Sequence, residues 1–279
     1  MDLYSTETSK LSWYRTDHVF KHVVDVKSDA DYFEATRFAE KNNLMIYSLG
    51  NGSNTFFQRK KITTLIIRNC MPQFIRSLGG DEYEVSSSVN MMKLLRYLYA
   101  NERDGPYNLA SVPATIGGAV AMNAGTGESA GLYISKFLRS VIYLHNGERF
   151  VKPVEDLEMG FRRSLFSEQR EYFIISALFV FPEREFDSNP ITERLDWAKN
   201  NQELKVANCG SVWRKANWRI LNFTYKLFSN SPAYISVKSR IWISNTSKSH
   251  RYILRILRFV RILHLLAFRK SEHEIRIVK

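Results

Sequence analysis

The sequences LGNGSNTFF at residues 49–57 and ASVPATIGGAVAMNAGTG at residues 110–127 decide the fold. In the first, Gly50 and Gly52 permit backbone conformations that turn successive N–H groups toward one concave side, as in an anion-binding nest. In the second, Pro113 is rigid, and the pair Gly117 and Gly118 lets the backbone approach a ligand closely. A helix that starts there would direct its N-terminus at a phosphate. Two such loops, about 60 residues apart, predict two halves of one diphosphate cradle.

Neither loop has the glycine spacing of a dinucleotide-binding fold or of a Walker loop, and each alone could be a tight turn. Strand and helix patterns alternate around them, which predicts an α/β or α+β arrangement. Helical spacing covers residues 29–42, 91–102, 191–204 and 250–268, and strand patterns cover 44–50, 63–69, 82–89, 137–151 and 171–181. Ser28 is a plausible N-cap for the first helix, and Asn146-Gly147 is a turn.

Length and composition narrow the class of protein. The chain has 279 residues, 44% of them hydrophobic and 24% charged, which excludes disordered and low-complexity classes and allows two or three domains. It contains two cysteines, Cys70 and Cys209, and neither a disulfide framework nor a metal-binding pattern is expected. We find no secretory signal and no uncharged apolar run of membrane-spanning length, and we therefore expect a soluble, cytoplasmic protein.

The positive charge is concentrated in the last third of the chain. Residues 194–279 hold 18 basic and 4 acidic residues, a net charge of +14, whereas the preceding 193 residues hold 22 and 24, a net of −2. This excess could be a solvated basic face. It could also serve an anionic substrate such as a nucleotide diphosphate, a nucleic acid or an anionic membrane surface. No known nucleic-acid motif is present, so a nucleic-acid partner is not expected.

The helical pattern at 250–268 carries Arg251, Arg255, Arg258 and Arg261 on one side. Such a helix could lie on a membrane or bind a partner. The favoured interpretation is an ordinary amphipathic helix that packs its apolar side into a core through four residues, namely Ile253, Leu257, Val260 and Leu263.

The two loops together resemble the flavin-binding signature of the UDP-N-acetylenolpyruvoylglucosamine reductase family, also called UDP-N-acetylmuramate dehydrogenases. The segments that carry this resemblance are LGNGSN and VPATIGGAVAMNAG. Three further segments match the family in order and extend the resemblance from about Trp13 to the C-terminus: FRRSLF (161–166), CGSVWRKAN (209–217) and EHEIRIV (272–278).

The resemblance implies an α+β chain with a two-subdomain FAD-binding fold of the vanillyl-alcohol-oxidase (PCMH) type, followed by a smaller α/β substrate-binding domain. We place the subdomains at residues 1–75 and 76–188, and the basic substrate-binding domain at 189–279. FAD would lie between the subdomains, without a metal. Its expected binding residues are Leu49, Gly50, Asn51, Gly52, Ser53, Asn54, Pro113, Ala114, Thr115, Ile116, Gly117, Gly118, Ala119, Met122 and Asn123.

The resemblance also implies a reaction. NADPH reduces FAD, and the reduced flavin reduces the enolpyruvyl group of UDP-N-acetylglucosamine enolpyruvate to give UDP-N-acetylmuramate, a peptidoglycan precursor. Arg162 and Glu274 would stabilise the developing enolate, and Ser211 would deliver the proton. Lys199, Arg214 and Lys215 would bind the UDP-sugar, and the protein would act as a monomer.

The chain departs from the family pattern in its last part. Phe161 replaces a tyrosine, Arg214-Lys215-Ala216 replaces Lys-Asn-Pro, and Ser239 stands where a histidine is expected, although Ser236, Trp242 and Asn245 keep their spacing. A divergent FAD-binding paralogue, with another nucleotide-sugar substrate or without turnover, is therefore the alternative. A basic module for nucleic acid or anionic lipid is the weakest of the three hypotheses.

Overall fold

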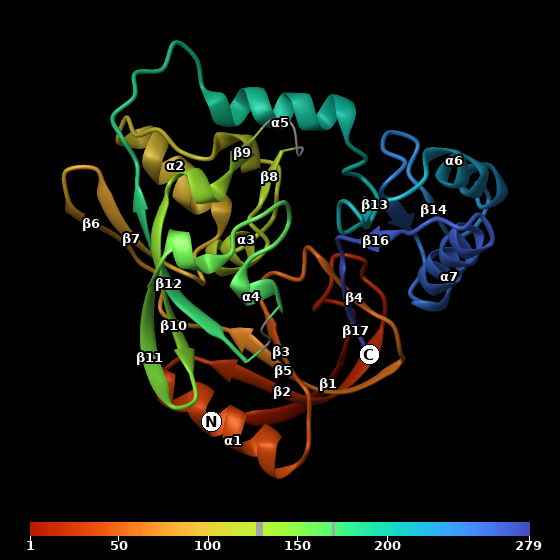
Figure 1. Cartoon of the computed structure of the whole chain (residues 1–279), viewed down its shortest axis with the longest axis horizontal. Helices are drawn as coiled ribbons and strands as arrows, with labels where there is room; N and C mark the ends of the chain where they lie inside the picture. Colours follow the sequence, from red (N-terminus) through yellow and green to blue (C-terminus); the bar gives the residue numbers. More distant parts are fainter. Residues whose placement is uncertain (127–130, 169–170) are drawn as a thin grey trace. The chain divides into compact units, whose positions relative to one another are not determined.

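The computed structural model describes residues 1–126, 131–168 and 171–279 (Figure 1). Its α-helices are α1 (Asp29–Lys41), α2 (Met91–Ala100), α3 (Ile116–Ala121), α4 (Leu165–Glu168), α5 (Pro190–Asn201), α6 (Trp218–Leu227) and α7 (Arg251–Leu266). Short 3-10 helices are η1 (Tyr107–Leu109), η2 (Ile134–Lys136) and η3 (Val154–Leu157).

The strands form two larger sheets and several two-stranded pairs. A four-stranded sheet has the order β1 (Leu3–Thr8), β2 (His18–Val26), β5 (Lys61–Asn69), β3 (Ile46–Leu49). A five-stranded antiparallel sheet has the order β11 (Glu148–Pro153), β10 (Leu138–His145), β12 (Phe173–Val180), β7 (Glu82–Ser86), β6 (Ile75–Gly79). The pairs are β4 (Thr55–Phe57) with β17 (Arg276–Val278), β8 (Gly125–Thr126) with β9 (Leu132–Tyr133), β13 (Trp213–Lys215) with β16 (Glu272–His273), and β14 (Ala233–Ile235) with β15 (Ile243–Asn245).

The chain divides into two compact units. Unit 1 comprises residues 1–4, 23–51 and 65–197, and unit 2 comprises residues 5–22, 52–64 and 198–279. The first glycine loop contains one of the crossing points, because Asn51 belongs to unit 1 and Gly52 to unit 2. Two N-terminal segments thus group with the basic C-terminal residues.

In unit 1, α1 packs on the four-stranded sheet. Ser28 caps the helix by accepting a hydrogen bond from the Asp31 N–H, and the Asp31 carboxylate accepts one from the Ser28 N–H. This reciprocal arrangement satisfies two backbone donors that would otherwise lack partners. One face of α1, including Tyr32, is buried against sheet residues such as Val24 and Leu65.

The helices α2 and α3 lie beside the five-stranded sheet of the same unit (Figure 1). Leu94 and Leu98 of α2 are fully buried and share a core with Val85 of β7 and Phe179 of β12. Because α3 starts at the second glycine loop, this packing fixes where that loop lies on the sheet.

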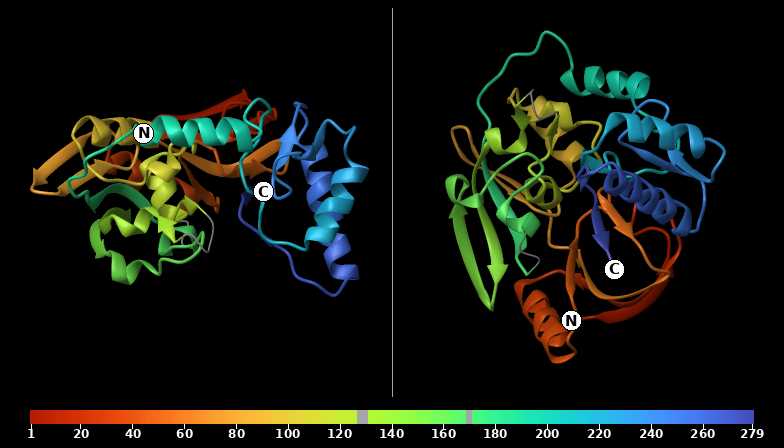
Figure 2. Two further views of the ribbon diagram at one scale, coloured as in Figure 1. Left: turned by 90° about the horizontal axis from the view of Figure 1, so that it is seen from above. Right: turned by 45° about the vertical axis from the view of Figure 1, so that its right-hand side comes forward.

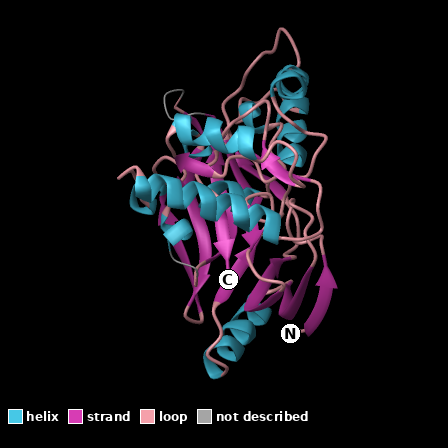
Figure 3. Cartoon of the chain, turned by 90° about the vertical axis from the view of Figure 1, so that its right-hand side faces the viewer, coloured by secondary structure: helices cyan, strands magenta, loops and turns pink. Residues whose placement is uncertain are grey.

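Unit 2 has its own core, built around the helix pair α6 and α7. The two helices lie side by side in both views of Figure 2, and they face the viewer in Figure 3. Trp213, Ile235 and Ile243 from the short strands pack with Ile253 and Ile256 of α7. The favoured interpretation of residues 250–268 is largely confirmed, since Ile253, Leu257 and Val260 are buried, while Leu263 is only half-buried.

The predicted α+β class is confirmed by the mixture of elements. Every predicted helix and strand named above has a counterpart, and Asn146-Gly147 forms the turn between β10 and β11. Several elements lie where no element was predicted, among them β1, β2, β6 and α6. In β2 the polar residues His18, Lys21 and Asp25 interrupt the apolar pattern, which hides a strand with one largely buried face.

His18 supplies a pH-dependent part of the stability of unit 2. The Arg59 carbonyl can only accept a hydrogen bond, so His18 Nδ1 (2.6 Å away) carries the hydrogen and Nε2 accepts from the Thr16 hydroxyl at 2.8 Å. This neutral form is favoured because burial, with lesser contributions from His250 and Lys60, lowers the pKa of His18 from 6.5 to about 4.

We therefore expect a loss of stability on acidification. The unfolded chain takes up a proton on His18 near pH 6.5 and the folded chain only near pH 4, so about 3 kcal/mol of unfolding free energy is lost across that window. His18→Gln can keep both hydrogen bonds without titrating. Urea unfolding at pH 7 and pH 4 measures this loss, and the unfolding free energy of the variant should differ less between the two pH values than that of the parent protein. An equal loss in both proteins would contradict this assignment.

Candidate functional site

The two glycine loops touch each other within unit 1. A Cβ atom at Gly50 would lie 2.6 Å from Thr115 Oγ1, so no side chain fits between them. The Asn51 side chain donates a hydrogen bond to the Pro113 carbonyl at 2.7 Å. Leu49, the first residue of this loop, is buried at the end of β3. β3 and the second loop therefore both hold the first loop in place.

In the second loop the paired glycines face different surroundings. A Cβ atom at Gly117 would lie 2.9 Å from Ser87 Cβ, so Gly117 is needed for packing against the segment that follows β7. A Cβ atom at Gly118 would meet only Thr115 Oγ1, at 3.4 Å. Gly118 thus leaves an open surface beside the first loop. Gly127, the last residue of this stretch, lies outside the described residues.

The donors available to an anion lie in the first loop rather than at the start of α3. The N–H groups of Ile116 and Gly117 donate to Val89 and Ser87, and that of Gly118 donates to Thr115 Oγ1, so the first turn of α3 is already satisfied. The expected phosphate at this helix N-terminus would find no free donor there. Within the described part of the chain, the backbone N–H groups of the first loop that have no acceptor are those of Gly50, Gly52, Ser53 and Asn54.

These free N–H groups are an observation of this structure that fits the diphosphate of a dinucleotide cofactor. Gly52 has φ +68°, and a left-handed residue within a short loop is how a nest turns neighbouring N–H groups to one side. The cradle needs glycine here for a second reason, because a Cβ atom at Gly52 would lie 2.3 Å from the Leu11 carbonyl oxygen.

Arg162 is held near the far end of α3. The Asn123 side chain donates to the Gly160 carbonyl at 3.0 Å, and the Ser164 hydroxyl donates to the Ala121 carbonyl at 2.7 Å. The turn between these anchors includes Arg162 at φ +55°, with its guanidinium 5.6 Å from the ring centroid of Phe161. The structure therefore brings Arg162 close to the second glycine loop.

Unit 2 brings together three residues that the sequence separates widely. The Glu274 N–H donates to the Val212 carbonyl at 2.9 Å, which puts Glu274 beside Ser211. The Asn54 side chain donates to the Glu274 carbonyl at 3.3 Å, and the Arg276 N–H donates to the Asn54 carbonyl at 3.0 Å. The Ser211 hydroxyl is half-buried and makes no hydrogen bond to a residue of the described ranges.

Cys209 anchors the turn before Ser211, a role that the sequence analysis missed. Its Sγ atom lies 3.6 Å from the Ser12 hydroxyl and donates to the Thr55 carbonyl at 3.5 Å. Burial raises the pKa of this thiol to about 11, so it stays protonated and acts as a donor. Gly210 follows at φ +68° and turns the chain toward Ser211. The sequence feature that could have indicated this role is a cysteine directly before a Gly-Ser pair.

The three basic residues expected at the substrate have different surroundings. The Arg214 guanidinium forms an ion pair with Glu272 at 2.8 Å and lowers the pKa of that carboxyl. Lys215, on the same strand, is exposed and forms no ion pair with a described residue. Lys199 is exposed on α5, and its carbonyl accepts a hydrogen bond from Lys238.

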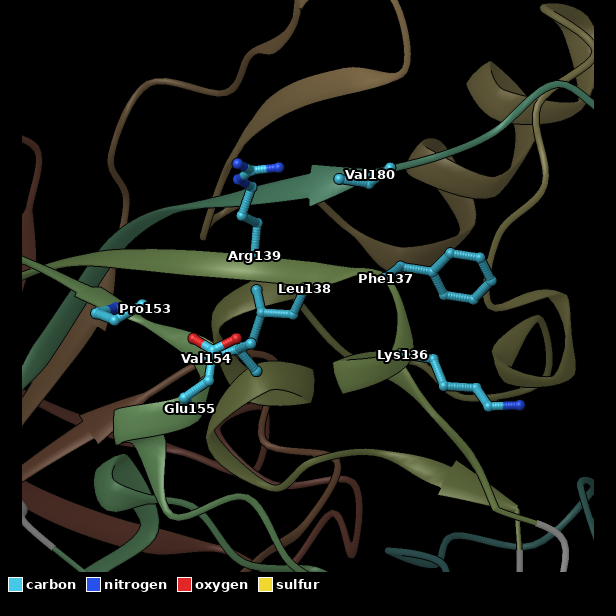
Figure 4. A pocket seen from close by; sticks show the side chains of 8 residues that line it. All are labelled: Lys136, Phe137, Leu138, Arg139, Pro153, Val154, Glu155 and Val180. Atoms are coloured by element: carbon cyan, nitrogen blue, oxygen red, sulfur yellow. The ribbon is translucent and has the colours of Figure 1, made fainter.

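A surface pocket of about 400 Å³ in unit 1 lies apart from these residues (Figure 4). Lys136, Arg139 and Glu155 are among its lining residues, and none of the predicted site residues lines it. Arg139 is already paired with Glu82, with 3.1 Å between Nη1 and Oε1. No group of three or more His, Cys, Asp or Glu side chains that could hold a metal ion occurs in the ranges that the structure describes.

Comparisons with known proteins identify the cofactor. Residues 20–149 match the family described as FAD binding domain. The chain is 31% identical over 186 residues to UDP-N-acetylenolpyruvoylglucosamine reductase of Exiguobacterium sibiricum, covering 65% of this chain and 59% of that protein. It is 29% identical over 184 residues to the Chlamydia pneumoniae protein of that name, with 65% and 58% covered. The chain thus spans about three fifths of these curated relatives.

The whole fold has a solved counterpart. The crystal structure of UDP-N-acetylenolpyruvylglucosamine reductase from Thermus caldophilus covers all of both chains with a TM-score of 0.76, at 20% sequence identity. The expected α+β FAD-binding fold is therefore confirmed. The chain is thus similar in sequence and in fold to UDP-N-acetylenolpyruvoylglucosamine reductases, and it takes FAD as its cofactor.

Proposed function

We propose that the protein is an FAD-dependent reductase. It uses NADPH to reduce the enolpyruvyl group of UDP-N-acetylglucosamine enolpyruvate and yields UDP-N-acetylmuramate. The observation that carries this proposal is the cluster of Ser211, Glu274 and Asn54 in unit 2. Hydrogen bonds to the backbone carbonyls of Val212 and Glu274 hold it together, although Ser211 and Glu274 are 63 positions apart in the chain. The names of the matched relatives support the substrate and reaction.

FAD, when bound, accepts a hydride and passes it on, so the residues of this chain need to bind, orient and supply charge and a proton. We assign diphosphate binding to the free N–H groups of Gly50, Gly52, Ser53 and Asn54. The cofactor is proposed to pack closely against the open surface at Gly118. The other residues of the two glycine loops named above are proposed to line the same site. Asn123 is buried, and its side chain bonds the Gly160 carbonyl and the Ser135 N–H, so its part is to hold the segment after α3 in place.

Ser211 is proposed as the proton donor to substrate carbon. Hydride addition to an enol ether leaves negative charge on the neighbouring carbon, and that carbon must gain a proton. A serine hydroxyl is a weak acid, so it serves only when the proton acceptor is strongly basic and close by. A half-buried hydroxyl with no competing hydrogen bond to a described residue suits this role.

Arg162 and Glu274 are proposed to stabilise the charge that develops before protonation. A guanidinium binds a carboxylate through two parallel hydrogen bonds and favours the enolate form of that group. The Glu274 carboxyl can favour an enolate only as a hydrogen-bond donor, and therefore in its neutral form. We assign binding of the anionic UDP moiety to Lys199, Arg214 and Lys215, of which Lys215 is exposed and Arg214 already holds Glu272.

Further proposals concern organisation and setting. The break between the two larger sheets falls at residues 70–74, which supports the boundary between the proposed subdomains 1–75 and 76–188. The substrate-binding domain is proposed as 189–279, most of which belongs to a compact unit that also includes residues 5–22 and 52–64. We propose a cytoplasmic monomer, since NADPH and nucleotide sugars are both cytoplasmic substrates.

A second candidate function is a divergent paralogue that binds FAD but acts on another nucleotide sugar or has no turnover. The specific observation in its favour is that Ser239 accepts a backbone hydrogen bond from Trp242 in a tight turn where the family has a histidine. Ser236 is fully buried and accepts from the Lys238 and Ser239 N–H groups, so the retained serine serves this turn.

The two glycines of the second loop should separate folding from cofactor binding. Gly118→Val adds a branched side chain on the open surface, so we expect folded protein that lacks the yellow flavin absorbance. Gly117→Ala pushes against Ser87 and should instead lower the unfolding free energy by about 1–3 kcal/mol. Absorbance spectra and thermal unfolding distinguish the two effects. A Gly118→Val protein with the normal complement of FAD would remove the second loop from the cofactor site.

Replacing Ser211 should separate the two half-reactions. Ser211→Ala removes the proposed acid and leaves the glycine loops intact, so NADPH should still reduce the flavin at a near-normal rate. Reoxidation by the enolpyruvyl substrate should slow by about 10²- to 10⁴-fold. Stopped-flow absorbance measures both steps.

Ser229→Ala, at an exposed serine of the same unit, is the matched control and should leave both rates unchanged. The assignment of Ser211 fails if its loss slows both half-reactions equally, or if it leaves the second one unaffected.

A further inference from the structure

The helix α7 has a second face that the core of unit 2 does not use. Its buried residues, such as Ile253 and Val260, lie on one side of the helix. At 3.6 residues per turn, the exposed residues fall on the opposite side. They change in character along the helix, with arginines up to Arg261 and aliphatic residues after it: Arg251, Arg255, Arg258, Arg261, Ile262, Leu265 and Leu266.

The aliphatic end of this face belongs to a larger exposed cluster. The Asn217 N–H donates to His264 Nε2 at 2.8 Å, which brings the start of α6 beside the last turn of α7 (Figures 1 and 2). We name the cluster the apolar tip, and it consists of side chains that are more than half exposed: Trp218 (59%), Ile262 (53%), Leu265 (63%), Leu266 (72%) and Phe268 (99%). Adjacent large apolar side chains exposed to this degree mark an interaction surface.

The surroundings of the apolar tip are positively charged. Residues 204–271 contain fourteen Lys and Arg residues and no Asp or Glu. Five exposed basic residues flank the tip in sequence and form no ion pair with any described residue: Arg219, Arg258, Arg261, Arg269 and Lys270. The complementary partner is therefore negatively charged and also offers an apolar interior.

An anionic phospholipid bilayer has both properties, because its headgroups are negatively charged and its interior is apolar. A helix that lies in the interface buries its apolar side by about 5–10 Å, while lysines and arginines stay at the phosphate level. Nucleic acid offers charge and stacking surfaces but no partner for exposed isoleucine and leucine. No helix among the described residues is long and apolar enough to cross a membrane, so the contact would be with the surface.

We propose that the apolar tip and its flanking basic residues form a docking surface for an anionic phospholipid bilayer. Trp218, Leu265, Leu266 and Phe268 enter the headgroup region, and Arg258, Arg261, Arg269 and Lys270 contact lipid phosphates. The other side of α7 remains in the core of unit 2, so docking requires no unfolding of the helix. This assignment concerns a surface outside the proposed catalytic residues and stands independently of the reaction.

Vesicle flotation of the full chain tests the proposal. We expect binding to vesicles of phosphatidylcholine with about 30% phosphatidylglycerol at about 0.1 M salt, and little binding to pure phosphatidylcholine. The triple variant Leu265→Gln, Leu266→Gln, Phe268→Gln should reduce the affinity at least about tenfold, with unchanged thermal unfolding because these side chains are exposed. A matched control with Leu78→Gln and Val151→Gln, two exposed apolar residues of unit 1, should bind normally.

A second variant tests the charge and gives a readout independent of the tip. Arg258→Gln, Arg261→Gln, Arg269→Gln should weaken anionic-vesicle binding and flatten its salt dependence. Tryptophan fluorescence should be quenched by brominated lipid, and Trp218→Phe should remove most of that quenching. The proposal is overturned if the chain fails to bind anionic vesicles, if the apolar variant binds as well as the parent, or if the tip instead mediates self-association or DNA binding without vesicle binding.

Discussion

The close approach of the two glycine loops is the constraint on which the proposed flavin-binding surface depends. At Gly50 even one methyl group would collide with the Thr115 hydroxyl. That hydroxyl caps α3 by accepting from the Gly118 N–H, so a side chain at position 50 would also disturb the start of the helix. Gly117 is fixed by Ser87 in turn, and the loop is therefore tied to the end of β7. The absence of two Cβ atoms, at Gly50 and Gly117, thus determines where the proposed cofactor surface can exist.

A comparable constraint organises unit 2 through the backbone. The Val212 carbonyl accepts from Glu274, and the Asn54 side chain and carbonyl hold the segment around Glu274 and Arg276. None of these contacts depends on the identity of the residues that differ from the family pattern, such as Ser239 or Ala216. The chain can therefore keep the geometry around Ser211 while neighbouring positions that depart from the family pattern change. This independence explains how segments that match the family pattern and segments that depart from it occur in one domain.

Local chemistry made part of this account predictable from sequence. Glycine permits backbone conformations and close approaches that other residues cannot make, and proline fixes the backbone, so the two loops could be anticipated from LGNGSN and VPATIGG, while their role toward the cofactor stays a prediction. The long periodic helices 29–42 and 250–268 were equally accessible, because burial of one face leaves a period in the sequence.

Other features depend on partners that are distant in the chain. The N–H groups of Ile116 and Gly117 are taken by Val89 and Ser87, which no pattern within residues 110–127 could indicate. The role of Cys209 likewise depends on Ser12 and Thr55, nearly 200 and more than 150 positions away. The strand β2 was hidden because it carries polar residues that find partners within the fold, as His18 does with Thr16 and Arg59.

The most direct test of the central claim is an anaerobic titration followed by absorbance. Purified protein should be yellow with bound FAD, and NADPH should bleach it. Addition of UDP-N-acetylglucosamine enolpyruvate should then restore the oxidised flavin spectrum with formation of one UDP-N-acetylmuramate per flavin. A flavin that NADPH reduces but this substrate cannot reoxidise would contradict the proposed reaction and favour the divergent paralogue.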